Sequence, residues 1–443
     1  MAYDVLFDNL GILAPPPQLG QTVDTPCTTD NSWECPAGFL KGGGIPPSAS
    51  AGTLSASAAR AATSGFIPDK TMPYAINWTF GVQHVFRKNY TLEVRYVGNR
   101  GVHLPLQTQL NQYAVVTANH SLPVYLAQPS QATLDALPLT LKQLTDQANA
   151  TSANSPEYYN AGFTSKITSY QPQGWSSYHG MDVQMDRRLT NGLVFRAAYT
   201  WSHAIDNSTA EVFSTYLTPR RPQDFRDLSV EKSDSALDHR HRITLTMLYD
   251  LPFFSHRSNY FLKNLVGNWE VAPIYTFQSG ERYTVQSGID SNLNGDAVDR
   301  TVINVAGVPG TGSTVSPLSN SNGDTVAYIA NTPTAQYIQA AKGVYPTSGR
   351  NTLLGRPIDN LDLTLVKRFS FGERFRLEFQ AQFLNALNHP QFIAGRLNDV
   401  FLDDFNNPSY QTLLKPGNVN FNQPENVFSS NPRSVQLALK LKF

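Results

Sequence analysis

The chain ends with the stretch NPRSVQLALKLKF at residues 431–443. Apolar residues hold every second position from Val435 to Phe443, and Gln, Ala or Lys hold the positions between them. Side chains on a β-strand alternate between two faces, so this segment predicts a strand with one continuous apolar face and one polar or small face. Such an apolar face either covers a protein core or meets lipid.

The same period-two pattern recurs in pairs along the chain, which predicts antiparallel hairpins. The paired apolar rows are Tyr74–Val82 with Tyr90–Tyr96, Met181–Met185 with Leu193–Trp201, Ile243–Leu251 with Trp269–Phe277, and Leu361–Leu365 with Phe375–Phe383. The terminal segment adds a ninth strand, and residues 2–7 (AYDVLF) are predicted to be the end of a tenth. The predicted fold class is therefore all-β.

Long connections alternate with these short turns. The long ones cover residues 9–73, 99–176, 204–238, 281–357 and 387–432. Compact soluble domains rarely use loops longer than about 15 residues, whereas outer-membrane barrels combine short periplasmic turns with long extracellular loops. We therefore expect residues 1–443 to form a partial transmembrane, antiparallel up-and-down β-barrel in the bacterial outer membrane, with roughly ten strands and these five connections outside the cell.

Composition narrows the class of protein further. The 443 residues include 34 basic and 34 acidic side chains, and this zero net charge argues against nucleic acid as a partner. Charged residues make up only 15% while aromatic residues reach 11%. The sequence contains no run of apolar residues long enough for a transmembrane helix. A barrel remains compatible with these values, because its strands show only alternating hydropathy.

The charged positions decide which face of each strand points outward. A cation such as Arg95 or Arg376 turned toward hydrocarbon near the midplane would cost about 2 to 4 kcal/mol, so the apolar rows are predicted to meet lipid. Amphipathic rings are expected at the two margins, with Tyr74, Trp78 and Trp201 outside and Tyr249 and Trp269 on the periplasmic side. The alternative is that these aromatic residues pack inside a soluble core.

The stretch DSNLNGDAVDR at residues 290–300 is the sharpest local motif. Its oxygen-bearing residues are Asp290, Asn292, Asn294, Asp296 and Asp299. Oxygen ligands at alternate positions around a glycine resemble the first half of a calcium loop, although the Glu expected at the twelfth position is missing. The alternative is an Asx-rich turn held by side-chain to backbone hydrogen bonds. Calcium is the one cofactor that the sequence suggests.

A second cluster, DHRHR at Asp238–Arg242, opens a predicted strand. It fits a metal or acid/base site, a lumen-facing charge network, or a solvated loop margin, and we favour the network because only two imidazoles and one carboxylate lie close together. The sequence shows no nucleophile elbow and no phosphate-binding glycine loop. The chain is therefore not expected to be an enzyme.

The two cysteines, Cys27 and Cys35, lie in a stretch rich in Pro, Gly and Ser. Their spacing lacks the paired Cys or His of a zinc site, and a loop disulfide in an oxidising compartment is the favoured interpretation. Two unrelated thiols are the alternative.

Several motifs together resemble the C-terminal barrel of the TonB-dependent receptor superfamily, in particular Oar-like proteins with a carboxypeptidase regulatory-like domain. They are YVGNRGVHL (Tyr96–Leu104), YTWSHAID (Tyr199–Asp206), DHRHR, NGDAVDR and FLNALNHPQF (Phe383–Phe392). The closing strand, with Leu439, Leu441 and Phe443, is similar to the signal that the outer-membrane assembly machinery recognises. We expect Met1 to be internal to a longer ancestral chain.

The resemblance implies a receptor or transporter barrel for substrate uptake. The implied partners are outer-membrane lipid, the assembly machinery and a small substrate such as an oligosaccharide, a peptide or a metal chelate. The TonB system would join them where the plug and the TonB-contacting segment are present. A non-transporting adhesion or scaffolding protein on the same barrel is the alternative function, and a soluble extracellular hydrolase is a third.

Overall fold

A computed structural model describes residues 56–61, 64–66, 71–87, 89–111, 114–153, 158, 161–163, 167–209, 221–253, 261–297, 299–371, 375–392, 410–427 and 430–443. The chain divides into two compact units. One comprises Met1–Ile67, Gln109–Gln112 and Ser152–Ser169, and the other comprises Pro68–Thr108, Tyr113–Thr151 and Tyr170–Phe443. The second unit contains nearly all of the regular structure.

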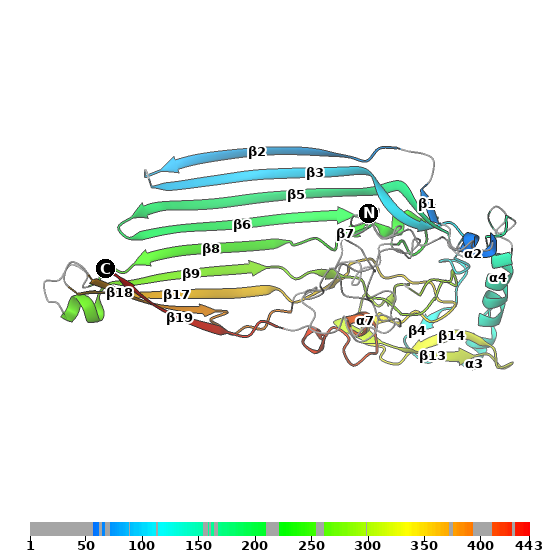
Figure 1. Cartoon of the computed structure of the whole chain (residues 1–443). Helices are drawn as coiled ribbons and strands as arrows, with labels where there is room; N and C mark the ends of the chain where they lie inside the picture. Colours follow the sequence, from blue (N-terminus) through cyan, green and yellow to red (C-terminus); the bar gives the residue numbers. More distant parts are fainter. Residues whose placement is uncertain are drawn as a thin grey trace, which may run out of the picture. The chain divides into compact units, whose positions relative to one another are not determined.

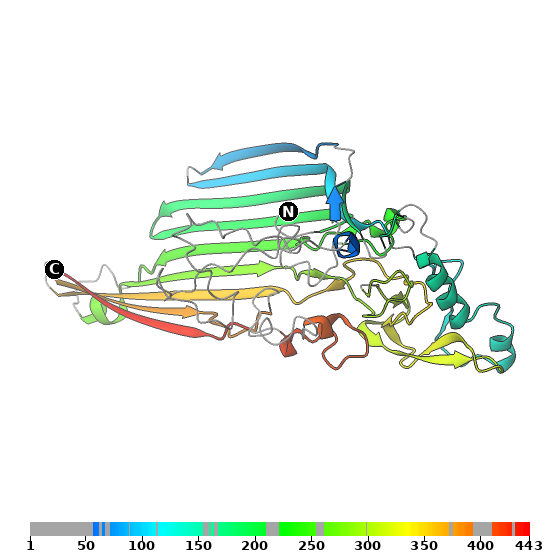
Figure 2. The same ribbon diagram turned by 45° about the vertical axis from the view of Figure 1, so that its right-hand side comes forward.

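The larger unit is built on one long sheet with the neighbour order β19-β18-β17-β9-β8-β6-β5-β3-β2 (Figure 1). The strands are β2 (Tyr74–Phe86), β3 (Tyr90–Gln109), β5 (Thr168–Thr190), β6 (Leu193–Asp206), β8 (His241–Asp250), β9 (Trp269–Gln278), β17 (Ile358–Phe371), β18 (Phe375–Leu384) and β19 (Ser434–Lys442). They remain side by side when the view is turned (Figure 2). The two-residue strand β7 (Ser233–Asp234) adds to the end of β6.

The four predicted hairpins and the terminal strand are confirmed. Each hairpin pairs antiparallel, as β2 with β3, β5 with β6, β8 with β9, and β17 with β18, and β19 pairs with β18. Asn191 and Gly192 form the two-residue turn between β5 and β6, and both have positive φ, as a type I′ turn requires. The predicted tenth strand at residues 2–7 lies outside the described residues.

The two faces of this sheet differ as the alternation predicts. The apolar row of β2 is exposed, with Phe80 71% accessible, and so is the row of β19, with Leu437 66% accessible. The opposite face carries ion pairs that link neighbouring strands, such as Arg196 with Asp186 and Arg368 with Glu270. No second protein layer covers these apolar rows in the described part of the chain, and the soluble-core alternative for these rows is wrong.

The strands run further than the predicted loop boundaries. The connection expected at 99–176 begins inside β3, which continues to Gln109, and ends inside β5, which starts at Thr168. The apolar alternation stops near Gly98, but backbone pairing continues through Tyr74 opposite Val102. The alternating pattern shows only which part of a strand lies in an apolar environment. Backbone pairing between strands can continue beyond that part.

The connection 281–357 was expected to be a loop, and the structure corrects this. It holds seven short strands: β10 (Arg282–Tyr283), β11 (Val302–Ile303), β12 (Val308–Ser313), β13 (Val315–Ser319), β14 (Thr325–Ala330), β15 (Ala335–Ile338) and β16 (Leu353–Leu354). They form small sheets, one of which includes β4 (Val124–Tyr125) from the connection 99–176. Strands of two to six residues are too short for their periodicity to stand out in the sequence.

Short helices lie in the long connections and in the turn between β8 and β9. They are α3 (Gln131–Asp135), α4 (Leu141–Ala153), α7 (Tyr410–Leu414) and the single turns η1 (Leu228–Glu231), η2 (Leu262–Val266) and η3 (Pro424–Asn426). Thr140 and Gln143 form a reciprocal capping box at the start of α4, with N···O distances of 2.9 and 3.2 Å. Among the described residues, none of the helices has the length and apolar character needed to cross a membrane.

In the part of the chain that the structure describes, the clusters of buried apolar residues lie in the connections. Leu122, Leu144 and Tyr328 join residues 114–153 to the connection 281–357. Tyr337, Leu413 and Phe421 join the same connection to residues 410–427. A fully buried Leu or Phe side chain contributes about 1.5 to 3 kcal/mol, so these contacts hold the connections to one another.

The smaller unit contains α2 (Ala56–Ala61) and β1 (Ser64–Phe66). Its other described segments are held together by hydrogen bonds, among them Leu110 N–H to the Ile167 carbonyl at 2.9 Å.

Candidate functional site

Four buried charges tie the connections of the larger unit to the end of strand β6. Arg350 donates to the carboxylate and to the backbone carbonyl of Asp206, and its Nε donates to the Glu231 carbonyl at 3.2 Å. Arg300 donates from Nη1 to Glu231 Oε2 at 3.0 Å. Arg350 is 2% exposed and Glu231 is 1% exposed. We call Asp206, Glu231, Arg300 and Arg350 the anchoring cluster.

The anchoring cluster balances two guanidinium groups against two carboxylates, so it buries no net charge. Its members come from β6, from the connection 204–238 and from the connection 281–357. Gln223 adds a neutral link, because its side chain accepts from Arg300 Nε at 3.1 Å and its backbone N–H donates to Glu231 at 3.0 Å. Removing one partner of a buried pair costs about 3 to 5 kcal/mol, so this cluster fixes the connections over the strand end.

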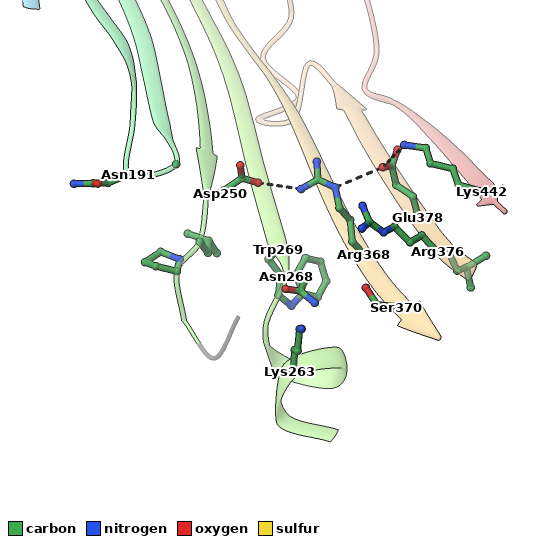
Figure 3. Close-up of a pocket in the computed structure, with 14 residues that line it drawn as sticks. Asn191, Asp250, Lys263, Asn268, Trp269, Arg368, Ser370, Arg376, Glu378 and Lys442 are labelled. Carbon is green, nitrogen blue, oxygen red and sulfur yellow. Dashed lines mark hydrogen bonds and ion pairs between the residues drawn. The ribbon is translucent and has the colours of Figure 1, made fainter. Parts of the chain in front are cut away.

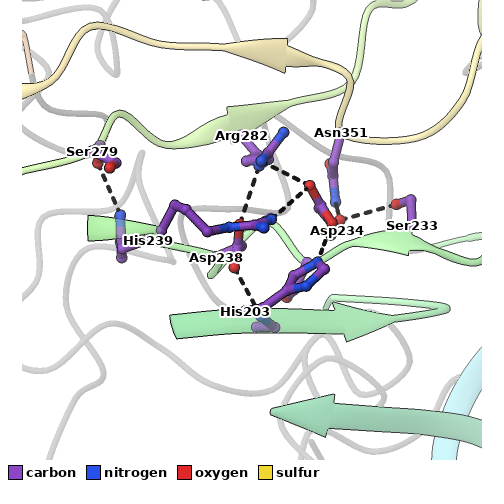
Figure 4. A network of polar contacts seen from close by, with 12 residues as sticks. His203, Ser233, Asp234, Asp238, His239, Ser279, Arg282 and Asn351 are labelled. Atoms are coloured by element: carbon purple, nitrogen blue, oxygen red, sulfur yellow. Dashed lines mark hydrogen bonds and ion pairs between the residues drawn. The ribbon is translucent and has the colours of Figure 1, made fainter. Parts of the chain in front are cut away.

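Figure 4 shows a second polar network, built around Asp234 and Asp238. Asp234 pairs with His203 at 2.7 Å, with Arg282 at 2.8 Å and with Arg240 at 3.2 Å. Asp238 accepts the backbone N–H of Ala204 at 2.8 Å and pairs with both arginines. The network joins β6, β7 and the segment before β8 to β10.

The DHRHR residues divide between this network and the strand margin. Asp238 and Arg240 are its members, whereas His239 contacts the Ser279 carbonyl at 3.2 Å and His241 contacts the Tyr199 hydroxyl at 3.0 Å. Among the described residues, no three His, Cys, Asp or Glu side chains are grouped as a metal site requires. The ion pairs confirm the charge-network interpretation for Asp238 and Arg240.

The DSNLNGDAVDR motif forms a turn closed by its own side chains. Asp290 accepts the backbone N–H groups of Asn294 and Gly295, both at 2.9 Å. Asn292 Oδ1 accepts from Asn294 N–H at 3.0 Å, and Asn294 Oδ1 accepts from Asp296 N–H at 2.8 Å. These are the contacts of the Asx-rich alternative. Calcium at Asp290, Asn292, Asn294, Asp296 and Asp299 stays a prediction.

Three residues of the motif reach beyond the turn. Asp296 pairs with Arg221 at 2.9 Å, and the side-chain amides of Asn292 and Asn294 donate to the Gln223 carbonyl. Asp299 is fully buried and accepts four hydrogen bonds, from the backbone and side chains of Ser291 and Asn292. Burial nevertheless raises the pKa of Asp299 to about 7. The motif thus holds the connection 204–238 against the connection 281–357.

A cavity of about 250 Å³ opens where three connections meet. It is lined by Ala114, Val116, Thr117, Ala118, Asn119, Gln223, Asp224, Asp227, Val230, Asn292 and Tyr345. The carboxylates of Asp224 and Asp227 and the ring of Tyr345 supply an acceptor-rich wall and one aromatic surface. These groups suit a small polar ligand that donates hydrogen bonds.

A larger cavity of about 780 Å³ lies at the opposite end of the long sheet, where the strands are joined by short turns (Figure 3). Arg368 is its central cation, paired with Asp250 at 3.0 Å, with Glu270 and with Glu378 at 3.5 Å. Lys442 contacts Glu378 at 3.3 Å. The ion pairs therefore connect β8, β9, β17, β18 and β19 on the polar face.

The other predicted site residues are placed as follows. Leu439 and Leu441 lie in the exposed outer row of β19, and Phe443 follows the end of that strand. Their role as an assembly signal stays a prediction. Cys27 and Cys35 lie outside the described residues, so the disulfide also stays a prediction. Sequence reasoning missed the anchoring cluster, because Asp206, Glu231 and Arg350 stand in unrelated segments with no shared spacing. Asp206 and Arg300 are the last residues of two motifs that were singled out, YTWSHAID and DSNLNGDAVDR, whereas Glu231 and Arg350 lie in none.

Comparison with known proteins gives a family for this architecture. A family model described as an outer membrane beta barrel domain matches residues 1–436. No curated protein sequence matches.

Solved structures similar to this chain include outer-membrane transporters. The outer membrane transporter YddB from Escherichia coli is 10% identical with a TM-score of 0.34, and the comparison covers 86% of this chain and 34% of that one. The FrpB iron transporter from Neisseria meningitidis is 8% identical with a TM-score of 0.32, covering 86% and 32%. This chain spans about a third of the length of each.

The family match extends over almost the whole sequence, and it agrees with the exposed apolar rows and the antiparallel sheet. It places the protein in the bacterial outer membrane. The chain belongs to the outer membrane beta barrel domain family.

Proposed function

We propose that this chain is the barrel portion of a TonB-dependent receptor that takes up a small substrate, with its short turns in the periplasm and its folded connections outside the cell. The carrying observation is the contrast between the two faces of the sheet: the outer rows are apolar and exposed, and the inner face holds ion pairs. A polar inner wall suits a lumen through which a hydrophilic solute or a plug passes.

The folded connections support a role in recognition. Their shared core and the anchoring cluster hold the cavity beside Asp224, Asp227 and Tyr345 in a fixed shape. A rigid surface loses little conformational entropy when a ligand binds. The substrate classes proposed from the family resemblance are an oligosaccharide, a peptide or a metal chelate, and we propose no catalytic step on any of them.

The last strand is proposed to serve assembly as well as structure. Leu439 and Leu441 face outward on β19, and Phe443 is 95% exposed at the end of that row. A side chain exposed in this way is available to the assembly machinery before insertion and to lipid afterwards. Replacing Phe443 with Ser should lower the amount of protein in the outer membrane, whereas the inner-face change Gln436→Ser should not.

Uptake in cells tests the proposal. Bacteria that produce the protein are supplied with labelled oligosaccharides, peptides and ferric chelates, with and without a protonophore. The proposal predicts accumulation of at least one class that stops with the protonophore and falls in the variant Asp224→Asn with Asp227→Asn. The surface variant Asp146→Asn, on α4, is the matched control. Binding without accumulation would contradict transport and favour the adhesion or scaffolding alternative.

A further inference from the structure

The connection between β8 and β9 carries an apolar surface at the short-turn end of the sheet. The single turn η2 lies in this connection. Among the residues described there, the apolar side chains with large exposed areas are Phe253, Phe261, Leu262, Leu265 and Val266. Phe261 is 77% exposed and Leu265 is 72% exposed. We call these five residues the turn patch. Such a concentration of exposed apolar side chains in a short connection marks an interaction surface.

The polar residues of η2 face the protein, which orients the turn patch away from it. The Asn264 side chain makes the hydrogen bonds that a neighbouring strand would make with β17. It donates to the Ser370 carbonyl at 3.3 Å and accepts from the Ser370 N–H at 2.9 Å. Lys263 lines the larger cavity together with Arg368 and Glu378 of the polar face (Figure 3). Leu265 and Val266 follow one turn after Phe261, so they lie on the same side as that ring.

The turn patch adjoins the lipid-facing row of β17 and β9. Gly267, which follows η2, accepts a hydrogen bond from Lys367 Nζ through its carbonyl. The Lys367 ammonium also lies 5.2 Å from the ring centres of Trp269 and Phe369. Lys367 is only 3% exposed, so the η2 turn covers this end of the row of β17. The turn patch therefore lies directly at the end of the row that we assign to lipid, beside a tryptophan as expected at the boundary between hydrocarbon and headgroups.

We propose that the turn patch is a membrane-surface anchor, which inserts its apolar side chains at the boundary between headgroups and acyl chains of the adjacent phospholipid leaflet. This rests on the proposed function, whose orientation makes that leaflet the periplasmic one. The turn lies parallel to the membrane plane, as an interfacial amphipathic segment does. The anchor holds the β8–β9 turn and the wall of the larger cavity at a fixed depth in the bilayer.

A protein partner could cover the turn patch instead of lipid. Lipid is favoured because the turn patch lies next to the row that faces hydrocarbon. Gly267, which directly follows the turn patch, accepts a hydrogen bond from Lys367 of that row, and Asn264 fixes the turn to β17. Lys367 in turn lies over the ring of Trp269. A patch built for a protein would not need to join the hydrocarbon-facing row.

Quenching by brominated phospholipid tests the anchor. In a chain with Cys27→Ser and Cys35→Ser, a bimane fluorophore is placed at Leu265→Cys, at Lys263→Cys or at Leu437→Cys, and each protein is reconstituted in phosphatidylethanolamine–phosphatidylglycerol vesicles. We expect a loss of fluorescence at Leu265 comparable with that at Leu437, and little loss at Lys263 on the other side of the same turn. Iodide, added in water, should quench Leu265 weakly.

Three results would overturn the inference in distinguishable ways. Strong iodide quenching at Leu265 without bromolipid quenching would show that water covers the turn patch. Protection of Leu265 from both quenchers would show that protein covers it. Absence of bromolipid quenching at Leu437 would contradict the barrel itself, and with it the proposed function, whereas quenching at Leu437 alone would leave the barrel intact and reject the anchor.

Discussion

Arg350 binds both the carboxylate and the backbone carbonyl of Asp206, which stands 144 residues earlier in the chain. This contact fastens the connection 281–357 to the end of β6, and Glu231 accepts from Arg350 and Arg300 on the other side. Because all four members of the anchoring cluster are buried, water cannot take the place of a partner that is removed.

Replacing Arg350 with Ala should therefore release the connection without unfolding the sheet. The change removes the cation paired with Asp206 and leaves Glu231 paired with Arg300, which corresponds to a loss of about 3 to 5 kcal/mol of stability. Hydrogen exchange should become faster throughout residues 281–357 while the protection of β8 and β9 stays the same. The surface change Lys142→Ala, which breaks an exposed pair with Asp146, should alter exchange little, and equal protection in both variants would reject the anchoring role.

Replacing Arg368 with Met should weaken the sheet from the opposite end. Asp250, Glu270 and Glu378 would then face one another without their central cation. Since Arg368 is partly exposed, the expected loss of stability is smaller, about 1 to 3 kcal/mol. Urea unfolding in lipid vesicles measures this loss as a lower midpoint. Arg356→Met, which breaks an exposed pair with Glu425, should cost no more than about 1 kcal/mol.

Burial of Asp299 predicts that stability depends on pH. Its pKa rises from 3.8 to about 7 on folding, so the folded state binds the proton more tightly than the unfolded state does. Its contribution to stability is full below about pH 4 and is lost as the pH rises toward 7. The free energy of unfolding of the connections should fall by about 2 kcal/mol between pH 5 and pH 7.

Asp299→Asn should remove most of this dependence, because the amide does not titrate in that range. Asp146→Asn, at an exposed site, should leave the dependence unchanged. Calorimetric melting of the three proteins at pH 5 and pH 7 provides the comparison. A pH dependence of stability in the Asp299→Asn variant identical to that of the natural protein would show that another group is responsible.

The alternation of side chains on β19 gives a prediction with a built-in control. Leu437→Arg places a cation on the outer row and should destabilise the inserted protein by about 2 to 4 kcal/mol near the bilayer midplane. Ala438→Arg places the same cation on the inner face, next to Gln380 of β18, and should have little effect. Folding titrations into vesicles measure both. Equal losses would contradict the assignment of faces.

The sequence was sufficient to predict the strands that cross the apolar region. The rows at Tyr74–Val82 and Val435–Phe443 follow from local alternation, which needs no knowledge of distant contacts. Their outward direction follows from the charges between them, as at Arg95 and Arg376. The same rule could not find the true ends of β3 and β5, because pairing there continues after the alternation has stopped.

The folded connections could not be predicted in the same way. Their strands are short, and their core joins residues far apart, such as Leu144 with Tyr328 and Tyr337 with Phe421. The anchoring cluster depends on burial that only this packing creates. The DHRHR motif gave a partial signal, since Asp238 and Arg240 were expected in a charge network, but their partners Asp234 and Arg282 carried no pattern of their own.

The central claim is that hydrocarbon covers the apolar row of each long strand. Nitroxide labels placed singly at each residue from 434 to 442, in protein reconstituted in phospholipid bilayers, measure it through collision with oxygen and with a polar nickel chelate. The account predicts a period of two, with Val435, Leu437, Leu439 and Leu441 accessible to oxygen and shielded from the chelate. Uniform access of both reagents, or protection of the Leu positions from both, would contradict it.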